Sequence, residues 1–309
     1  MTASVVHRAE YLALRGLTGL LGTLPLSSAR RIGAGVARLG YSPLGIRRHV
    51  VMRQIAGAFP DLPEPEVRRL AKSAYGHLGR VVVETAVLPS LGREGVLGLF
   101  EGEDGFDAIE RVVAEGRGVI LITGHFGNWE LAGAYVAARG IPIEVIARRM
   151  SNPFADGWVT RTREGAGMRV VYDADAVRRT PRALREGHAV AFVADQGVLG
   201  LASTFVPFFG RPAKTPRGAA VFALRFGVPA FFVAAVLEES GKYRCVVTPI
   251  PIQDTGDREA DVDAMVGTHT AVLEEWVRRY PEQYFWHHRR WRRQPKETPP
   301  ELRDPVAAA

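Results

Sequence analysis

The pattern of apolar and polar positions divides the chain into two parts. In the first ninety residues, apolar positions recur at helical spacing and proline-bearing breaks separate the segments. From about residue 100, short apolar runs alternate with helix-length segments. Helices are predicted over residues 12–24, 29–39, 47–58, 64–87, 106–115, 129–139, 153–166 and 261–279. Strands are predicted over residues 118–123, 143–147, 169–172, 189–194, 229–237 and 243–248.

Alternating strands and helices are typical of an α/β layer built on a largely parallel sheet. We therefore predict an α/β fold with a mixed, largely parallel sheet flanked by helices, preceded by an amino-terminal helical segment. The predicted division is a helical segment over residues 1–90, an α/β core over 91–295 and a proline-rich, loose tail over 296–309.

Composition and charge narrow the class of protein. Apolar residues make up 47% of the chain and charged residues 24%, which is ordinary for a folded domain. A single cysteine, Cys245, excludes an internal disulfide and a cysteine-rich metal site, and it fits a reducing compartment. The net charge of +7 is concentrated in residues 1–60, which hold eight arginines and one acid, Glu10. That segment favours an anionic partner, either a membrane surface or nucleic acid.

The amino-terminal segment is too short in apolar length to cross a bilayer. Its longest uncharged run, Gly16–Ala29, falls below the roughly 20 residues that a span needs and contains Pro25. Four leucines in the region recur at helical spacing: Leu14, Leu17, Leu21 and Leu24. This stripe predicts either an interfacial helix on an anionic membrane or a helix packed on the protein's own core. Because Arg15 interrupts the apolar run and no A-x-A site follows, a cleaved signal peptide is not expected.

The stretch "TGHFGNWE", Thr123–Glu130, follows the apolar run "GVILI" and contains the first candidate site. His125 sits where a strand ends and a helix begins, with Asn128 as the predicted helix N-cap. Ligands of open α/β sheets bind at that edge. A neutral histidine can take a proton from an alcohol, and the Glu130 carboxylate can hold its ring. The alternative is that Glu130 only complements the helix dipole and His125 caps a turn.

Three further candidates follow other predicted strands. Arg148 and Arg149 come directly after one strand, and arginine binds phosphate through forked hydrogen bonds. Asp195 closes the strand "AVAFVA" and is predicted either to position the His125 loop or a sugar hydroxyl, or to cap a turn. A solvated turn is the alternative for the two arginines.

The segment Gln196–Lys214 is predicted to be a long loop rich in aromatic residues. Long loops at such a sheet edge are commonly functional. We predict that Phe205, Phe208 and Phe209 form a wall of an acyl-chain pocket, with simple core packing as the alternative. Lys214 precedes a predicted helix start at Thr215–Pro216 and is a candidate for binding phosphate.

Several of these stretches together resemble a known family. "GHFGNWE" resembles the His-x4-Asp/Glu motif of lysophospholipid and glycerophosphate acyltransferases. More closely, the chain resembles the bacterial lipid A biosynthesis acyltransferases. The similar stretches are "ARRMSNP" (147–153), "ADQG" (194–197), "FVPFFGRPAKTPRG" (205–218) and "YPEQYFWHHRRW" (280–291). The resemblance runs from about residue 10 to 295.

The resemblance implies an O-acyltransferase with a glycerophosphate-acyltransferase-like core. Such an enzyme moves a fatty acyl chain from an acyl carrier protein or coenzyme A thioester to a hydroxyl of an anionic glycolipid, here a lipid A precursor. His125 is then the general base and Glu130 orients it, with no metal and no bound cofactor. The implied location is peripheral, at the cytoplasmic face of the inner membrane. Acyltransferases of phosphatidylinositol mannosides share the superfamily motif, so the acceptor stays open.

Two other classes of protein are less favoured. A basic membrane- or nucleic-acid-binding protein would explain the arginines, but no zinc-finger spacing or RNA-recognition motif is present, so no nucleic-acid partner is expected. A serine hydrolase is not expected, because the chain has no G-x-S-x-G elbow.

Overall fold

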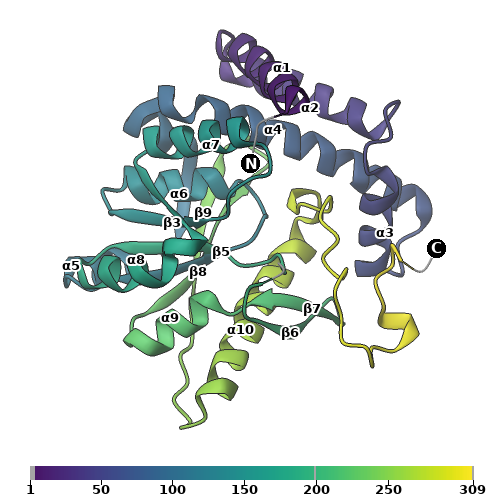
Figure 1. Cartoon of the computed structure of the whole chain (residues 1–309). Coiled ribbons are helices and arrows are strands. Elements are labelled where there is room, and N and C mark those ends of the chain that lie inside the picture. The colour runs from purple at the N-terminus through teal and green to yellow at the C-terminus, as the bar shows by residue number, and fades with distance from the viewer. Residues whose placement is uncertain (1–3, 198–199, 308–309) are drawn as a thin grey trace.

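The computed structural model describes residues 4–197 and 200–307, which are built around a seven-stranded sheet (Figure 1). The strands in spatial order are β1 (Phe100–Asp104), β9 (Tyr243–Ile250), β8 (Ala230–Leu237), β2 (Val119–Thr123), β5 (Ala189–Val193), β3 (Ile143–Ala147) and β4 (Met168–Tyr172). Neighbouring strands are parallel except β8 and β9, which are antiparallel. The predicted mixed, largely parallel sheet is confirmed.

The central strands are apolar on both faces because helices cover both. Along β2, Ile120 and Ile122 face one hydrophobic cluster, while Val119 and Leu121 face the other. The covering helices are α5 (Asp107–Ala114), α6 (Trp129–Ala138), α7 (Pro153–Gly165), α8 (Asp173–Arg185), α9 (Gly218–Phe226) and α10 (Arg258–Arg279). All six predicted strands are present, but the sequence pattern did not predict β1, an edge strand in which only Phe100 is buried.

Four helices precede the sheet, along the top and right of Figure 1: α1 (Val5–Gly22), α2 (Leu26–Tyr41), α3 (Arg48–Ala58) and α4 (Glu64–Gly98). α4 crosses the predicted boundary at residue 90 and packs on both α2 and α6. It kinks at Gly92, where φ is +60°. Among the described residues, no helix is both long and apolar enough to cross a membrane.

Some leucines of the amino-terminal stripe are buried against the protein, and others are exposed to solvent. Leu21 is buried against Ala29 and Val83, so one face of α1 packs on the protein. Leu17 is exposed on the same helix, and Leu24 is exposed in the turn that follows it. Other large apolar side chains exposed on α1 and α2 are Val5, Val6, Leu12, Leu20, Ile32, Val36 and Leu39. The amino-terminal helices therefore pack on the core and also present an apolar surface to solvent.

Two predictions about residues 196–216 are corrected, one for a loop and one for a helix start. The segment Gln196–Lys214 is not one long loop, because it contains most of an antiparallel hairpin, β6 (Ser203–Phe208) and β7 (Arg211–Pro216). The hairpin contains three prolines, and because proline is rare within strands, the sequence did not predict strands here. β7 continues to Pro216 and α9 begins at Gly218, beyond the predicted helix start.

The tail, which was predicted to be loose, contacts the rest of the protein at Asp304. Arg289 forms an ion pair with the buried Asp304 carboxylate at 2.6 Å, and the Gln54 amide of α3 donates to it at 3.3 Å. Gln54 lies in α3 and Arg289 lies in the segment after α10. Asp304 therefore links the carboxyl-terminal tail to the amino-terminal helices.

One buried carboxylate connects the amino-terminal helices to the sheet. Glu84 of α4 is fully buried, and one of its oxygens lies 2.6 Å from Arg30 Nε and 2.9 Å from Arg80 Nε. The other oxygen accepts hydrogen bonds from Asn128 Nδ2 at 2.7 Å and from the Tyr243 hydroxyl at 2.5 Å. Glu84 thus joins α2, α4, β9 and the N-cap of α6.

Removing this carboxylate should destabilise the whole protein. Glu84→Ala leaves two arginines without a counter-charge and two buried donors without an acceptor, so we expect a loss of about 3–5 kcal/mol in the free energy of unfolding. The matched control is Glu94→Ala, at an exposed position of the same helix, where we expect a change within about 0.5 kcal/mol. Chemical denaturation measures both; equal effects would contradict the role given to Glu84.

Candidate active site

The register of two neighbouring strands places His125 beside Asp195. β2 and β5 are parallel, with Thr123 opposite Val193, and each candidate follows its strand by two residues. His125 Nδ1 lies 2.7 Å from Asp195 Oδ1, and the His125 backbone N–H donates to Oδ2 at 3.1 Å. The carboxylate therefore fixes both the ring and the backbone of the histidine.

The charge state of Asp195 determines which ring nitrogen is basic. Burial alone would raise the pKa of this carboxyl, but the charge of His125, its hydrogen bonds and the charge of Arg290 lower the pKa to about 2. Asp195 is ionised at neutral pH and can only accept hydrogen bonds. The Nδ1 proton of His125 is therefore donated to Asp195, which leaves Nε2 as the nitrogen that can take a proton.

Aromatic rings and the carboxyl-terminal segment hold the imidazole in place. The rings of Trp129 and Phe285 lie 5.0 and 5.8 Å from the His125 ring, centroid to centroid. The Phe285 N–H donates to the His125 carbonyl at 2.9 Å. The side-chain nitrogen of Gln196 lies 3.0 Å from His125 Nδ1.

The loop after His125 depends on glycine and on the predicted cap. Gly127 has a φ of +59°, and a Cβ there would lie 2.1 Å from the Ala235 carbonyl oxygen, so no other residue fits. His77 of α4 donates to the Gly127 carbonyl at 2.9 Å. Asn128 caps α6 by accepting from the Leu131 N–H, as the sequence predicted.

Glu130 makes a different contact from the one predicted. Both of its oxygens accept from Arg163 of α7, at 2.8 Å from Nε and 2.6 Å from Nη2, and Trp129 Nε1 donates to it at 3.1 Å. The sequence pattern predicted that Glu130 contacts the His125 ring, but in the structure Asp195 makes that contact. The physical reason is that Glu130 lies beside α7, where a forked guanidinium matches its carboxylate. A catalytic role for Glu130 stays a prediction.

Arg163 was not among the site residues predicted from the sequence. A weak signal was present, because Asp156, Thr160 and Arg163 recur at helical spacing along α7 and all three line the same cavity. A polar stripe of this kind on a helix that covers a sheet indicates a buried polar site.

A cavity of about 820 Å³ opens beside His125, within the size range of ligand pockets. Polar side chains line one end: His125, Glu130, Arg148, Asp156, Arg163 and Gln196. Apolar side chains from the sheet, α6, α7, α8 and α9 line much of the remainder, among them Leu121, Val136, Val145, Met168, Val177 and Phe222. The site thus combines a basic imidazole with a long apolar interior.

The structure separates the two adjacent arginines. Arg148 lines the cavity. The Arg149 guanidinium instead lies 3.9 Å from the Tyr172 ring centroid and 4.0 Å from Asp156, and most of its side chain is exposed. Lys214 lies on β7 outside the cavity lining, where its carbonyl accepts from Arg290.

The three phenylalanines do not line this cavity. Phe208 and Phe209 are buried in a cluster with aromatic residues of the carboxyl-terminal segment, including Trp286. Phe205, on the hairpin strand β6, is 44% exposed. Edge-to-face contacts of Phe209 with Phe208 and with Phe59 place two of the rings in the core. A place for the three phenylalanines in an acyl-pocket wall stays a prediction.

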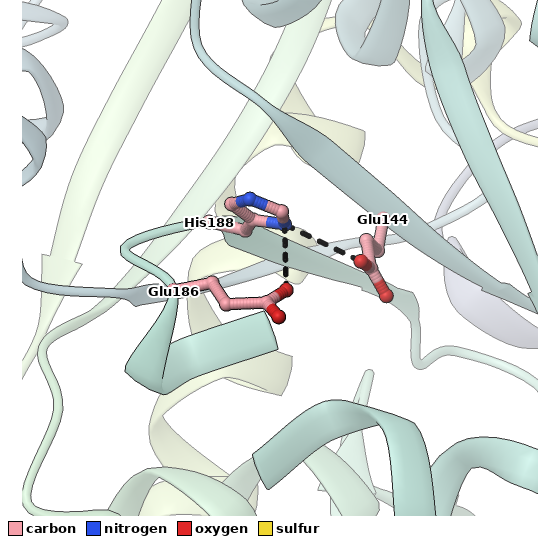
Figure 2. A group of neighbouring side chains, drawn as sticks. All are labelled: Glu144, Glu186 and His188. Carbon is pink, nitrogen blue, oxygen red and sulfur yellow. Dashed lines mark hydrogen bonds and ion pairs between the residues drawn. The ribbon is translucent and has the colours of Figure 1, made fainter. Parts of the chain in front are cut away.

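Across residues 4–197 and 200–307, one group of three potential metal ligands is found: Glu144, Glu186 and His188 (Figure 2). It lies at the amino ends of β3 and β5, away from His125. In Figure 2, one ring nitrogen of His188 points toward both carboxylates. Arg179 already donates to both oxygens of Glu144, at 3.0 and 2.8 Å, which is typical of an ion-pair network.

Comparison with known proteins identifies the family. Residues 4–293 match the bacterial lipid A biosynthesis acyltransferase family, and the chain belongs to it. The chain is 26% identical over 288 residues to the lipid A biosynthesis lauroyltransferase of Escherichia coli (strain K12), covering 92% of each chain. It is 25% identical over 282 residues to the lipid A biosynthesis palmitoleoyltransferase of the same organism, covering 91% of this chain and 90% of the relative.

A relative with another acceptor in its name is also similar. The phosphatidylinositol mannoside acyltransferase of Mycolicibacterium smegmatis is 25% identical over 262 residues, covering 82% of this chain and 83% of the relative. The resemblance drawn from the sequence motifs is confirmed, and the protein is an acyltransferase.

Asp195 should control the basicity of His125. In Asp195→Asn, an amide can face Nδ1 with its NH₂ group and favour the wrong tautomer, so we expect kcat for transfer to fall by about 10²–10⁴. Because Asp195 acts through His125, the double variant with His125→Ala should be no slower than His125→Ala alone. Single-turnover transfer rates measure both effects.

The matched control is Asp175→Asn, an exposed carboxylate on α8, which should keep the parent rate. Two results together would assign the orienting role to Glu130. Asp195→Asn would keep a near-parental kcat, and the effects of Glu130→Gln and His125→Ala on kcat would be non-additive.

Proposed function

We propose that the protein transfers a fatty acyl chain from an acyl thioester to a hydroxyl of an anionic glycolipid, most closely a lipid A precursor. The donor is acyl carrier protein or coenzyme A, and no bound cofactor takes part. The observation that supports this best is the His125–Asp195 pair beside a largely apolar cavity of about 820 Å³.

In the proposed mechanism, Nε2 of His125 takes the proton of the acceptor hydroxyl as its oxygen attacks the thioester carbonyl. The resulting imidazolium is stabilised by the ionised Asp195. The amino-terminal end of α6 begins four residues after His125, and its partial positive charge favours the oxyanion. When the carbon–sulfur bond breaks, the imidazolium returns its proton to the leaving thiolate, giving an ester and a thiol.

The proposal for an anionic acceptor rests on the positive charge at the polar end of the cavity. Arg148 and Arg163 are permanently charged and line the polar end of the cavity, where they suit the phosphate of a glycolipid. A second acceptor class, a phosphatidylinositol mannoside, is supported by the similarity to the Mycolicibacterium smegmatis enzyme over 82% of this chain. Both acceptors are anionic glycolipids with a free hydroxyl.

Transfer by purified protein tests the proposal. With acyl carrier protein and coenzyme A thioesters offered separately, we expect ester formation on a phosphorylated lipid A precursor, detected by mass spectrometry. His125→Ala should lower the rate by about 10²–10⁴, and removing the acceptor phosphates should weaken acceptor binding. His49→Ala, at an exposed histidine of α3, serves as control. A folded His125→Ala variant with near-parental transfer would refute the proposed base.

We further propose peripheral attachment to the cytoplasmic face of the inner membrane through α1 and α2. These helices expose apolar side chains such as Leu12 and Leu20, 61% and 66% exposed, in a segment rich in arginine. A basic, apolar surface of this kind binds anionic bilayers.

Vesicle sedimentation tests the attachment. The full-length protein should bind anionic vesicles at low salt and release as the Debye length falls from about 10 Å at 0.1 M to about 3 Å at 1 M. Leu12→Ser with Leu20→Ser should weaken binding, whereas Ile252→Ser, at an exposed position outside the amino-terminal helices, should not. Equal binding by all variants would exclude these helices as the attachment surface.

A further inference from the structure

At one apolar end of the cavity, between α6 and β4, a helix contacts a strand. Gly133 of α6 and Met168 of β4 both line the cavity. A Cβ added at Gly133 would lie 2.6 Å from Met168 Sδ, so the glycine and the thioether already touch. Met168 and its neighbour Ile143 are each only 3% exposed, so this end of the cavity is shielded from solvent.

Strand register places this contact at the far end of the cavity from the polar residues. Met168 pairs with Ile143 at the start of β4 and β3, and Tyr172 pairs with Ala147 at their ends. The polar end follows directly, at Arg148. Ala147 is four positions after Ile143, and at about 3.3 Å per position this is a depth of about 13 Å.

Glycine at position 133 is not explained by backbone geometry. Gly133 lies inside α6 and is not among the glycines with positive φ, and alanine would favour a helix more strongly. Steric room is the remaining constraint, because any side chain here must displace Met168 or enter the cavity. Methionine is flexible and adapts to an irregular space, so the two residues together define how far the cavity extends.

We propose that Gly133 and Met168 form the floor of the acyl-chain pocket and set the longest acyl chain that the enzyme transfers. This inference rests on the proposed function of the cavity. A chain whose carbonyl carbon lies at His125 runs along α6 and places its methyl end against Met168. A longer chain must move the thioether or leave methylenes outside the apolar interior, and a shorter one leaves space unfilled.

Two substitutions should shift chain-length preference in opposite directions. Gly133→Leu fills the floor and should favour shorter donors, whereas Met168→Ala deepens it and should favour longer ones. A single methylene in an apolar pocket changes kcat/KM by roughly 10–200-fold, so we expect the ratio between donors that differ by two carbons to move by at least about tenfold. Saturated acyl thioesters of graded length, offered in competition and resolved by mass spectrometry, measure the ratio.

Milder variants and a matched control distinguish a change in chain-length preference from a loss of folding. Gly133→Ala and Met168→Val should shift the ratio in the same directions but less. Met52→Ala removes a methionine side chain from the other hydrophobic cluster, outside the cavity lining, and should leave the ratio unchanged. If every variant lowers transfer equally for all donors, Gly133 and Met168 only pack together and the inference is wrong.

A binding readout separates this inference from the proposed function. Saturated fatty acids of graded length should bind the full-length protein, with an affinity maximum that moves down in Gly133→Leu and up in Met168→Ala. If transfer is absent while the binding maximum moves, the proposed function fails and the floor stands. If transfer is present and neither maximum nor ratio moves, the floor is refuted and the function stands.

Discussion

The burial of one carboxylate, Glu84, is the constraint on which the arrangement of this protein depends. A charge taken out of water must be fully paired, and here two arginines and two neutral donors complete it. Because these partners come from α2, α4, β9 and the N-cap of α6, the carboxylate is satisfied only when all four are in place. The amino-terminal helices are therefore part of the catalytic fold, and Asn128 ties the loop that carries His125 to them.

The sequence allowed the edge of the site to be predicted, but not its pairings. Apolar runs identified the strands, and the structure places the first polar residues after them, His125, Arg148 and Asp195, at the same edge of the sheet. Which of these residues touch depends on the spatial order of β2, β5 and β3, and that order arises from packing. Asp195 is 70 positions from His125, so local spacing favoured Glu130, whose actual partner lies on α7.

The remaining errors have physical causes in particular segments. β1 was not predicted because its sequence is polar, since an edge strand buries few side chains. β6 and β7 were not predicted because they contain Pro207, Pro212 and Pro216, which a two-stranded hairpin tolerates. Phe208 and Phe209 were predicted to line an acyl-chain pocket because their aromatic partners, Trp291 and Trp286, are distant in the sequence. The tail appeared loose from composition, since the pairing of Asp304 with Arg289 and Gln54 is a tertiary contact.

The parallel register of β2 and β5 has a consequence for how the chain tolerates change. The sheet ladder, and not the intervening segment, sets the distance between the histidine and the aspartate, because each lies two residues beyond a paired position. Excursions such as the turn between α7 and β4 can lengthen, shorten or be opened without moving the two groups apart. The backbone could be cleaved there, or the termini relocated there by circular permutation, and a reassembled protein would keep the contact between His125 and Asp195.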